Sequence, residues 1–174
     1  MRPRGVVREL TVTDAAAYFD LRRRAHETDP HAFKPAVADD PGLSLTRIES
    51  TLTRDPRGTR ACILGAFTRQ LVGALGLVQE LDVRDRAQLW GLYVTPEQRR
   101  AGLGLSLVSA ACDRARGMNG IERLQLRVAV ACPEAIRLFE RFGFERSRSS
   151  GATEVAGRVD DDLWMVLELP DEAA

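Results

Sequence analysis

The chain has 174 residues, of which 25 are Lys or Arg and 25 are Asp or Glu, so its formal net charge at pH 7 is zero. This balance gives no bulk attraction to nucleic acid or to a membrane surface, and we expect neither as a partner. Apolar residues make up 44% and charged residues 29% of the chain, which together with its length predicts one globular domain over residues 1–174.

The three cysteines, Cys62, Cys112 and Cys132, lie far apart and form no CxxC pair. This spacing favours reduced thiols and a cytoplasmic location, and it predicts neither a disulfide framework nor a metal site. No apolar run is long enough to span a membrane, and no apolar segment of a signal peptide follows the first residues.

In the first half of the chain, apolar spacing alternates between the periods of strands and helices. We predict a strand at 6–11, a helix at 14–27, a proline-rich loop at 29–42, a short helix capped by Ser44, and a hairpin of strands at 59–67 and 71–80. The run from Arg22 to Arg24 in the first helix is interpreted as a solvated face, with nucleic-acid binding as the alternative.

The second half continues with a strand at 87–94, a helix that starts in the glycine-containing turn at Gly102–Gly104 and reaches about 116, a strand at 124–129, a helix that begins at Pro133, a polar loop at 145–157, and a last strand at 163–169. Because a helix separates the strands at 87–94 and 124–129, we expect these two strands to be parallel, joined by a right-handed crossover.

The turn between the strand at 87–94 and the next helix predicts an anion site. Gly102 and Gly104 lack a Cβ and open a helix whose first N–H groups are unpaired, and Arg99 and Arg100 add positive charge beside them. The turn is not a dinucleotide fingerprint, since the third glycine is replaced by Leu107, and it has no Gly-Lys-Ser/Thr of a P-loop.

Two blocks of sequence resemble the GNAT acyltransferase superfamily. Residues 99–104, Arg-Arg-Ala-Gly-Leu-Gly, resemble its Gln/Arg-x-x-Gly-x-Gly/Ala signature, and Ala135, Leu138, Phe139 and Gly143-Phe144 resemble its A-x-x-L-Y-x-x-x-G-F segment. The resemblance implies an α/β (α+β) fold: a mixed, mostly antiparallel sheet of six to seven strands, flanked by about four helices, with parallel fourth and fifth strands that splay apart.

The resemblance also implies acetyl-CoA as acyl donor, without a metal. Its pantetheine arm would lie against the fourth strand and its pyrophosphate on the glycine turn. The implied cofactor-binding residues are Leu92, Tyr93, Val94, Arg99, Arg100, Ala101, Gly102, Leu103, Gly104, Leu105, Cys132 and Phe139.

The catalytic candidates are Glu80 and Tyr93. Glu80 ends a predicted strand and could take the proton of the amine directly or through water, with Asp82 and His31 as weaker candidates. The family's proton-donating tyrosine is replaced by Phe139, so either Tyr93 protonates the leaving thiolate or the thiolate leaves unaided.

Cys132 stands where relatives often have an asparagine that bonds the pantetheine, and a covalent acyl-enzyme on this thiol is a further alternative. A tryptophan, Trp90, is a packing residue or lines the acceptor slot.

We therefore predict an N-acetyltransferase that moves the acetyl group to a primary amine of a small molecule or protein by direct attack in a ternary complex. A non-catalytic acyl-CoA sensor is the alternative, and a homodimer is possible in this family. The sequence does not identify the acceptor: acidic residues in the loops, Asp39, Asp40, Glu80, Asp82, Asp160, Asp161 and Asp162, would suit a cationic amine or simply be solvated.

Overall fold

A computed structural model of the chain describes residues 5–33, 44–54, 60–80, 83–147 and 162–170. Seven strands form one sheet in the order β1-β2-β3-β4-β5-β7-β6. The strands are β1 (Val6–Glu9), β2 (Ala61–Phe67), β3 (Leu71–Gln79), β4 (Arg86–Val94), β5 (Arg123–Ala129), β6 (Glu145–Arg146) and β7 (Asp162–Glu168). The helices are α1 (Ala15–Thr28), α2 (Leu45–Arg54), α3 (Leu103–Arg116) and α4 (Pro133–Phe142), with short 3-10 turns η1 (Val12–Asp14) and η3 (Pro96–Gln98).

The sheet is mixed, as predicted: all neighbouring strands in it run antiparallel except β4 and β5, which are parallel. One detail differs from the sequence prediction. Glu145 and Arg146, expected in a loop, form the edge strand β6 against Val166 and Met165 of β7. Residues 148–157 of that predicted loop lie outside the described residues.

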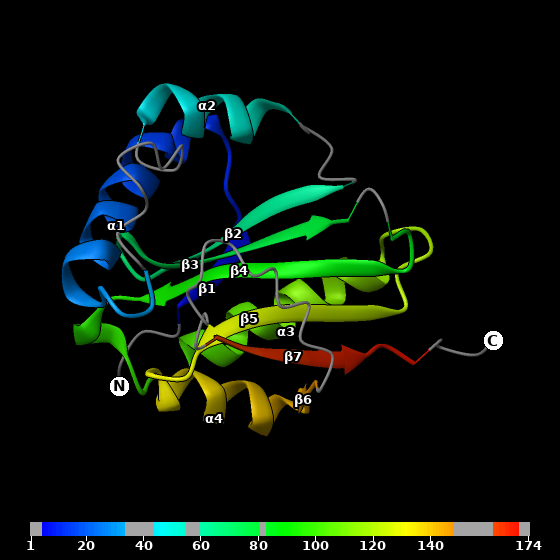
Figure 1. Cartoon of the computed structure of the whole chain (residues 1–174). Coiled ribbons are helices and arrows are strands. Elements are labelled where there is room, and N and C mark those ends of the chain that lie inside the picture. Colours follow the sequence, from blue (N-terminus) through cyan, green and yellow to red (C-terminus); the bar gives the residue numbers. More distant parts are fainter. Residues whose placement is uncertain (1–4, 34–43, 55–59, 81–82, 148–161, 171–174) are drawn as a thin grey trace, which may run out of the picture.

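The helices cover the sheet from both sides (Figure 1). On one face, Tyr18 and Leu21 of α1 and Ile48 of α2 pack on β2, β3 and β4. On the other face, α3 and α4 bury a larger apolar cluster that includes Leu107, Val108 and Phe139. The central strands β2 and β3 are buried along most of their length, and their residues belong in turn to the cluster under α1 and α2 and to the cluster under α3 and α4.

The start of α1 is fixed by a carboxylate, Asp14, which forms a capping box with Thr11. Its oxygens accept two hydrogen bonds of 2.8 Å from the guanidinium of Arg8 on β1. The bond to Arg8 is the largest cause that lowers the pKa of Asp14 to about 2, against an ordinary value of 3.8. This ion pair attaches α1 to the edge of the sheet.

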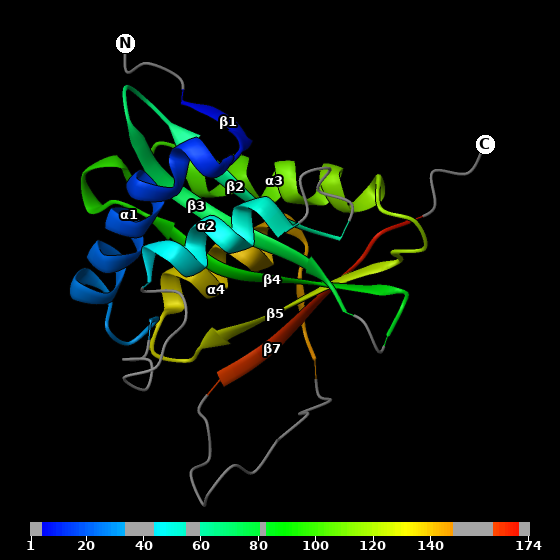
Figure 2. The ribbon, with the colours of Figure 1, turned by 90° about the horizontal axis from the view of Figure 1, so that it is seen from above.

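The parallel pair separates partway along its length. The β4–β5 ladder runs from Arg86 opposite Arg123 to Leu89 opposite Leu126 and stops there, although the strands continue to Val94 and Ala129. Figure 2 shows the two ribbons diverging in this direction. The splayed pair predicted from the family resemblance is confirmed.

Candidate active site

A bulge in β4 marks the point where the two strands part. Residues Gly91 and Leu92 together face Leu75 of β3, because the register shifts between the pairs Ala74–Tyr93 and Gly76–Trp90. Gly91 has φ +66°, a left-handed conformation that favours glycine. A glycine within an apolar strand is itself a signal for a bulge, so this bulge could have been predicted from the sequence.

A cleft of about 90 Å³ opens where β4 and β5 diverge. Its lining combines the two faces of the sheet: Phe33 and Trp90 belong to the face under α1, whereas Leu89, Leu126 and Phe139 belong to the face under α3 and α4. A cleft between parted strands that is lined from both faces can admit one reactant from each side.

Three of the predicted cofactor residues line this cleft: Leu92, Cys132 and Phe139. Cys132 precedes α4, and Phe139 is 4% exposed with its ring edge toward Phe144, the ring centroids being 5.5 Å apart. Burial is the main cause that raises the pKa of the Cys132 thiol, and the carboxylates of Asp29 and Asp162 raise it further. Both effects favour the neutral thiol of Cys132 over its thiolate.

The glycine turn follows β4 and leads into α3, at the end of the sheet where β4 and β5 part. Arg100 has φ +60° and Gly102 has φ +82°, and no described atom lies within 4 Å of the position that a Gly102 Cβ would occupy. Among the described residues no side chain caps the start of α3, so its first N–H groups point outward. Such a helix start with an open approach is a favourable place for an anion.

The second glycine of the turn has a different role from the first. A Cβ on Gly104 would come within 2.8 Å of Leu138 Cδ1 in α4. Its missing side chain lets α3 and α4 pack closely, whereas Gly102 leaves space on the outer surface. Leu103 is buried in the core, and Leu105 is half-buried.

Arg99 is held by protein atoms. Its Nε donates to the carbonyl of Val94 over 2.9 Å, and its guanidinium forms an ion pair with Asp29, which follows the end of α1. The guanidinium also lies 5.8 Å from the Tyr93 ring. Arg99 thus joins the end of α1 to the end of β4, while Arg100 and Ala101 are exposed on the turn.

The two predicted catalytic residues lie outside the cleft lining. Tyr93 is 4% exposed, and its hydroxyl is 2.9 Å from Thr28 Oγ1 of α1. Glu80 accepts a hydrogen bond from the side-chain amide of Gln125, which in turn accepts a bond of 3.2 Å from Arg86. Of the weaker base candidates, His31 is exposed and does not line the cleft, and Asp82 lies outside the described residues.

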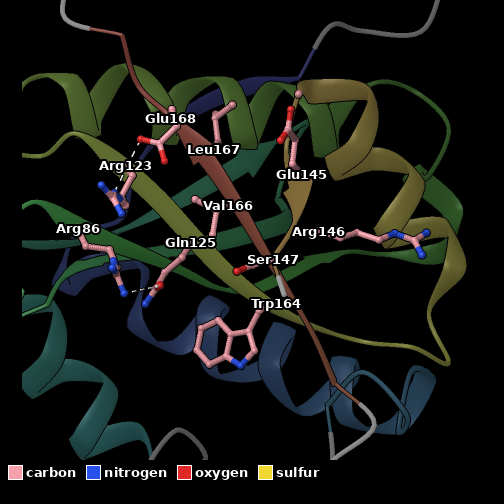
Figure 3. A pocket seen from close by; sticks show the side chains of 11 residues that line it. Arg86, Arg123, Gln125, Glu145, Arg146, Ser147, Trp164, Val166, Leu167 and Glu168 are labelled. Atoms are coloured by element: carbon pink, nitrogen blue, oxygen red, sulfur yellow. Dashed lines mark hydrogen bonds and ion pairs between the residues drawn. The ribbon is translucent and has the colours of Figure 1, made fainter. Parts of the chain in front are cut away.

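Arg86 and Gln125 belong to a second hollow, of about 760 Å³, on the sheet face formed by β5, β6 and β7 (Figure 3). Its arginines have partners within the protein: Arg86 bonds Gln125, Arg123 lies 3.8 Å from Glu168, and Arg146 bonds Glu140 of α4. Carboxylates of the protein therefore offset the charges of Arg123 and Arg146, whereas the partner of Arg86 is a neutral amide.

The sequence profile of the Acetyltransferase (GNAT) family matches residues 16–144. This chain belongs to the GNAT acetyltransferase family. It is therefore an acyltransferase domain of the acetyl-CoA-dependent type, and the fold described above is the fold of that family.

Individual relatives agree with this membership. A mycothiol acetyltransferase of Saccharopolyspora erythraea is 32% identical over 157 residues, covering 86% of this chain, which spans only 46% of that protein's length. The uncharacterised N-acetyltransferase YjgM of Escherichia coli is 30% identical over 94% of this chain and 95% of its own. The structure of yncA from Salmonella typhimurium, solved with its cofactor acetyl-CoA, superposes with a TM-score of 0.75 at 20% identity, covering 98% of this chain and 96% of its own.

The residues that the structure describes were also searched for metal-binding groups and for helices that could span a membrane. No group of three or more His, Cys, Asp or Glu side chains among them is placed to hold a metal ion. None of their helices has the length and apolar character needed to cross a lipid bilayer.

Proposed function

We propose that this GNAT domain transfers the acetyl group of acetyl-CoA to a primary amine by direct attack in a ternary complex. The observation that supports it most strongly is the cleft between β4 and β5, which is lined from both sheet faces and lies at the end of the sheet where α3 begins. Donor and acceptor can then meet between the strands from opposite sides.

On the donor side, the pyrophosphate of acetyl-CoA would lie on the turn at residues 99–105, against the first N–H groups of α3 and beside Arg100. The pantetheine amides would bond the backbone of Leu92, Tyr93 and Val94, which has left the β5 ladder. The acyl end would enter between Cys132 and Phe139.

The chemical step forms one bond and breaks another. The amine nitrogen attacks the thioester carbon, whose oxygen accepts a hydrogen bond from a backbone N–H near the bulge at Gly91–Leu92. The carbon–sulfur bond then breaks, the sulfur takes the electron pair, and the nitrogen loses its proton. Because the thioester is already activated, holding the two reactants together provides much of the rate.

Proton transfer in this proposal needs neither Tyr93 nor Phe139. A thiol is acidic enough for CoA to leave as the thiolate, which water can protonate. Glu80 was predicted as base, but a base must reach the amine directly or through one water, and Glu80 is engaged with Gln125. We therefore propose that the amine loses its proton to water in the cleft.

Direct attack is favoured over an acyl-enzyme on Cys132. The attacking species of a cysteine is its thiolate, and burial together with Asp29 and Asp162 raises the pKa of this thiol. A Cys132→Ser variant should therefore keep most of its turnover, and mass spectrometry of the enzyme with acetyl-CoA alone should show no added acetyl group.

The test of the function combines two measurements on the whole chain. Calorimetric titration with acetyl-CoA should show saturable binding, and CoA release should require an added amine. Binding with no release for any amine of a broad panel would instead identify a sensor of acyl-CoA. Absence of binding would remove acetyl transfer altogether.

A further inference from the structure

Two neighbouring arginines of the donor turn, residues 99–105, differ in their surroundings. Arg100 is exposed, and the proposal above places it beside the pyrophosphate. Arg99 extends to the end of α1, where its guanidinium pairs with Asp29 while its Nε donates to the Val94 carbonyl over 2.9 Å. The family resemblance implies that both arginines bind the cofactor, whereas the contacts of Arg99 lead to the side of the cleft under α1.

Asp29 connects this guanidinium to one wall of the cleft. Its backbone carbonyl accepts hydrogen bonds of 3.0 Å from the N–H groups of Ala32 and Phe33, so residues 29–33 form a compact turn. The side chain of Phe33 lines the cleft on the side under α1. Arg99 therefore holds the side chain of the same residue whose carbonyl fixes the backbone of Phe33.

Tyr93 supports the same wall from β4. Its buried ring meets the Phe33 ring edge to face, with centroids 5.8 Å apart and ring planes at 83°. The guanidinium carbon of Arg99 lies 5.8 Å from the centroid of the Tyr93 ring. The Tyr93 hydroxyl is 2.9 Å from Oγ1 of Thr28, the residue before Asp29. Two connections, one through Asp29 and one through Tyr93, thus join Arg99 to Phe33.

The Asp29–Arg99 pair is better sheltered from solvent than a second ion pair between α1 and the segment after β4. The side chains of Arg99 and Asp29 are 35% and 29% exposed. Those of Arg24 and Glu97, which form the second pair, are 42% and 60% exposed. Because partly buried charges are screened less than exposed ones, the Asp29–Arg99 pair is the stronger constraint on the end of α1.

We propose that Arg99 is a positioning residue for the acceptor and not a ligand of acetyl-CoA. It holds residues 29–33 against the end of β4, which keeps the Phe33 side chain in the wall past which the amine reaches the thioester. The inference rests on the acetyl transfer proposed above and names a residue that sets the binding of the acceptor.

Loss of the Arg99 guanidinium should therefore affect one reactant and spare the other. Without it, the Asp29 carboxylate loses its partner, and Phe33 can move away from the wall. A displacement of about 1 Å in a group that positions a reactant can cost about 100-fold in rate. Arg100 and the first N–H groups of α3, where we place the pyrophosphate, keep their positions.

The test measures the donor and the acceptor separately, in wild type and in Arg99→Gln. Calorimetric titration gives the affinity for acetyl-CoA, and CoA release gives kcat and KM for the amine. The probes are 2-phenylethylamine, spermidine, Nα-acetyl-lysine and a peptide with a free N-terminal alanine, and the best acceptor of wild type is used for all variants. We expect kcat/KM for this amine to fall by roughly 10- to 100-fold, chiefly through KM, whereas the dissociation constant of acetyl-CoA should change by less than about threefold.

Further variants test the connection through Asp29. Asp29→Asn should impair the same amine, and the double variant should be no worse than the more impaired single variant, since both substitutions break one ion pair. Arg99→Lys keeps the charge and should restore part of the loss. Arg24→Gln is the matched control, because it breaks the pair with Glu97 but leaves the contacts of Asp29 intact. It should change neither the kinetic constants nor the affinity.

The outcomes distinguish this inference from the proposed function. If Arg99→Gln loses affinity for acetyl-CoA by about tenfold or more, with or without an effect on the amine, Arg99 is a cofactor ligand and the inference is wrong, although acetyl transfer stands. It is also wrong if Arg99→Gln acts no differently from Arg24→Gln, or if the effects of Asp29→Asn and Arg99→Gln simply add. If acetyl-CoA binds but no amine releases CoA from wild type, the transferase proposal fails and the inference fails with it.

Discussion

The turn at residues 99–105 and the side of the cleft under α1 are both parts of the proposed site, but they are built in different ways. The turn is one short segment that offers backbone N–H groups at the start of α3. The side of the cleft under α1 combines side chains of α1, the segment after it, β4 and β5, namely Arg22, Phe33, Trp90 and Arg127. A cofactor shared by a family can be held by backbone, whereas the choice of acceptor depends on side chains brought together by the fold.

The first prediction concerns the binding of acetyl-CoA on the donor side of the cleft. Gly102→Glu places a carboxylate on the open surface of the turn, where it should repel the pyrophosphate and weaken acetyl-CoA binding by at least about 100-fold, or about 2.7 kcal/mol. Calorimetric titration measures the affinity of the variant and of wild type.

The matched control is Gly120→Glu. Gly120 has φ +79°, close to the +82° of Gly102, and the nearest atom to its Cβ position is Arg84 O at 3.9 Å. Both variants should lose about 1–2 kcal/mol of stability through backbone strain, but only Gly102→Glu should lose acetyl-CoA. Equal affinities of the two variants would contradict the placement of the pyrophosphate.

The second prediction changes stability without touching either side of the cleft. Asp14→Asn removes the charge that pairs with Arg8, and since the pKa of Asp14 falls from 3.8 to about 2 on folding, the variant should be less stable by about 2 kcal/mol at pH 7. In wild type this contribution is fully present above about pH 5 and is lost as the pH falls through the folded pKa of about 2. Urea unfolding at a series of pH values measures it.

Asp20→Asn serves as comparison for that variant. Asp20 is 70% exposed and its pair with Arg23 is long, so its removal should cost less than about 0.5 kcal/mol. Neither substitution should change KM for acetyl-CoA. A change in that KM on Asp14→Asn would mean that α1 is coupled to the donor turn.

The sequence supplied a hypothesis for the donor side because its signal is local. Gly102 follows a strand and precedes a helix within a few residues, and the spacing of Phe139 and Gly143 supplied the second block. It also predicted the parallel pair, since a helix between two strands requires a crossover.

The side of the cleft under α1 could not be predicted because its residues meet only in the folded chain. Arg22 was interpreted as one of three solvated arginines, and nothing in that run distinguishes it from Arg23. Its contact with Trp90 depends on where α1 crosses β4, which periodicity does not give. Glu80 was chosen because it ends a strand, but β3 is antiparallel to β4, so its end lies away from the point where β4 and β5 part.

A third prediction links the two sides through Cys132. Asp29 raises the pKa of this thiol, so Asp29→Asn should lower it and speed alkylation of Cys132 near pH 8 by a few-fold. The other cysteines, Cys62 and Cys112, are buried, and their modification should be slower. Acetyl-CoA should protect Cys132 in both proteins, since this residue lines the cleft.

Alkylation is measured as a rate against pH, with Cys132→Ser to identify the fast-reacting thiol. Glu27→Gln is the control for the loss of one negative charge, because Glu27 lies two residues before Asp29 in the chain and is exposed. An unchanged rate on Asp29→Asn would show that the Asp29–Arg99 pair is too well neutralised to act on the thiol.

The smallest expected effect is that of Glu80→Gln. Glutamine keeps the size of the side chain and can still accept the hydrogen bond from Gln125, so the local packing should survive. If water takes the proton of the amine, as we propose, kcat/KM at pH 8 should change by less than about threefold, against a factor of about 100 or more for the loss of a general base. A large fall in kcat, with a pH profile that loses its acidic limb, would return Glu80 to the role predicted from the sequence. The acceptor would then need a base after all, and a lysine-like amine would become the better candidate.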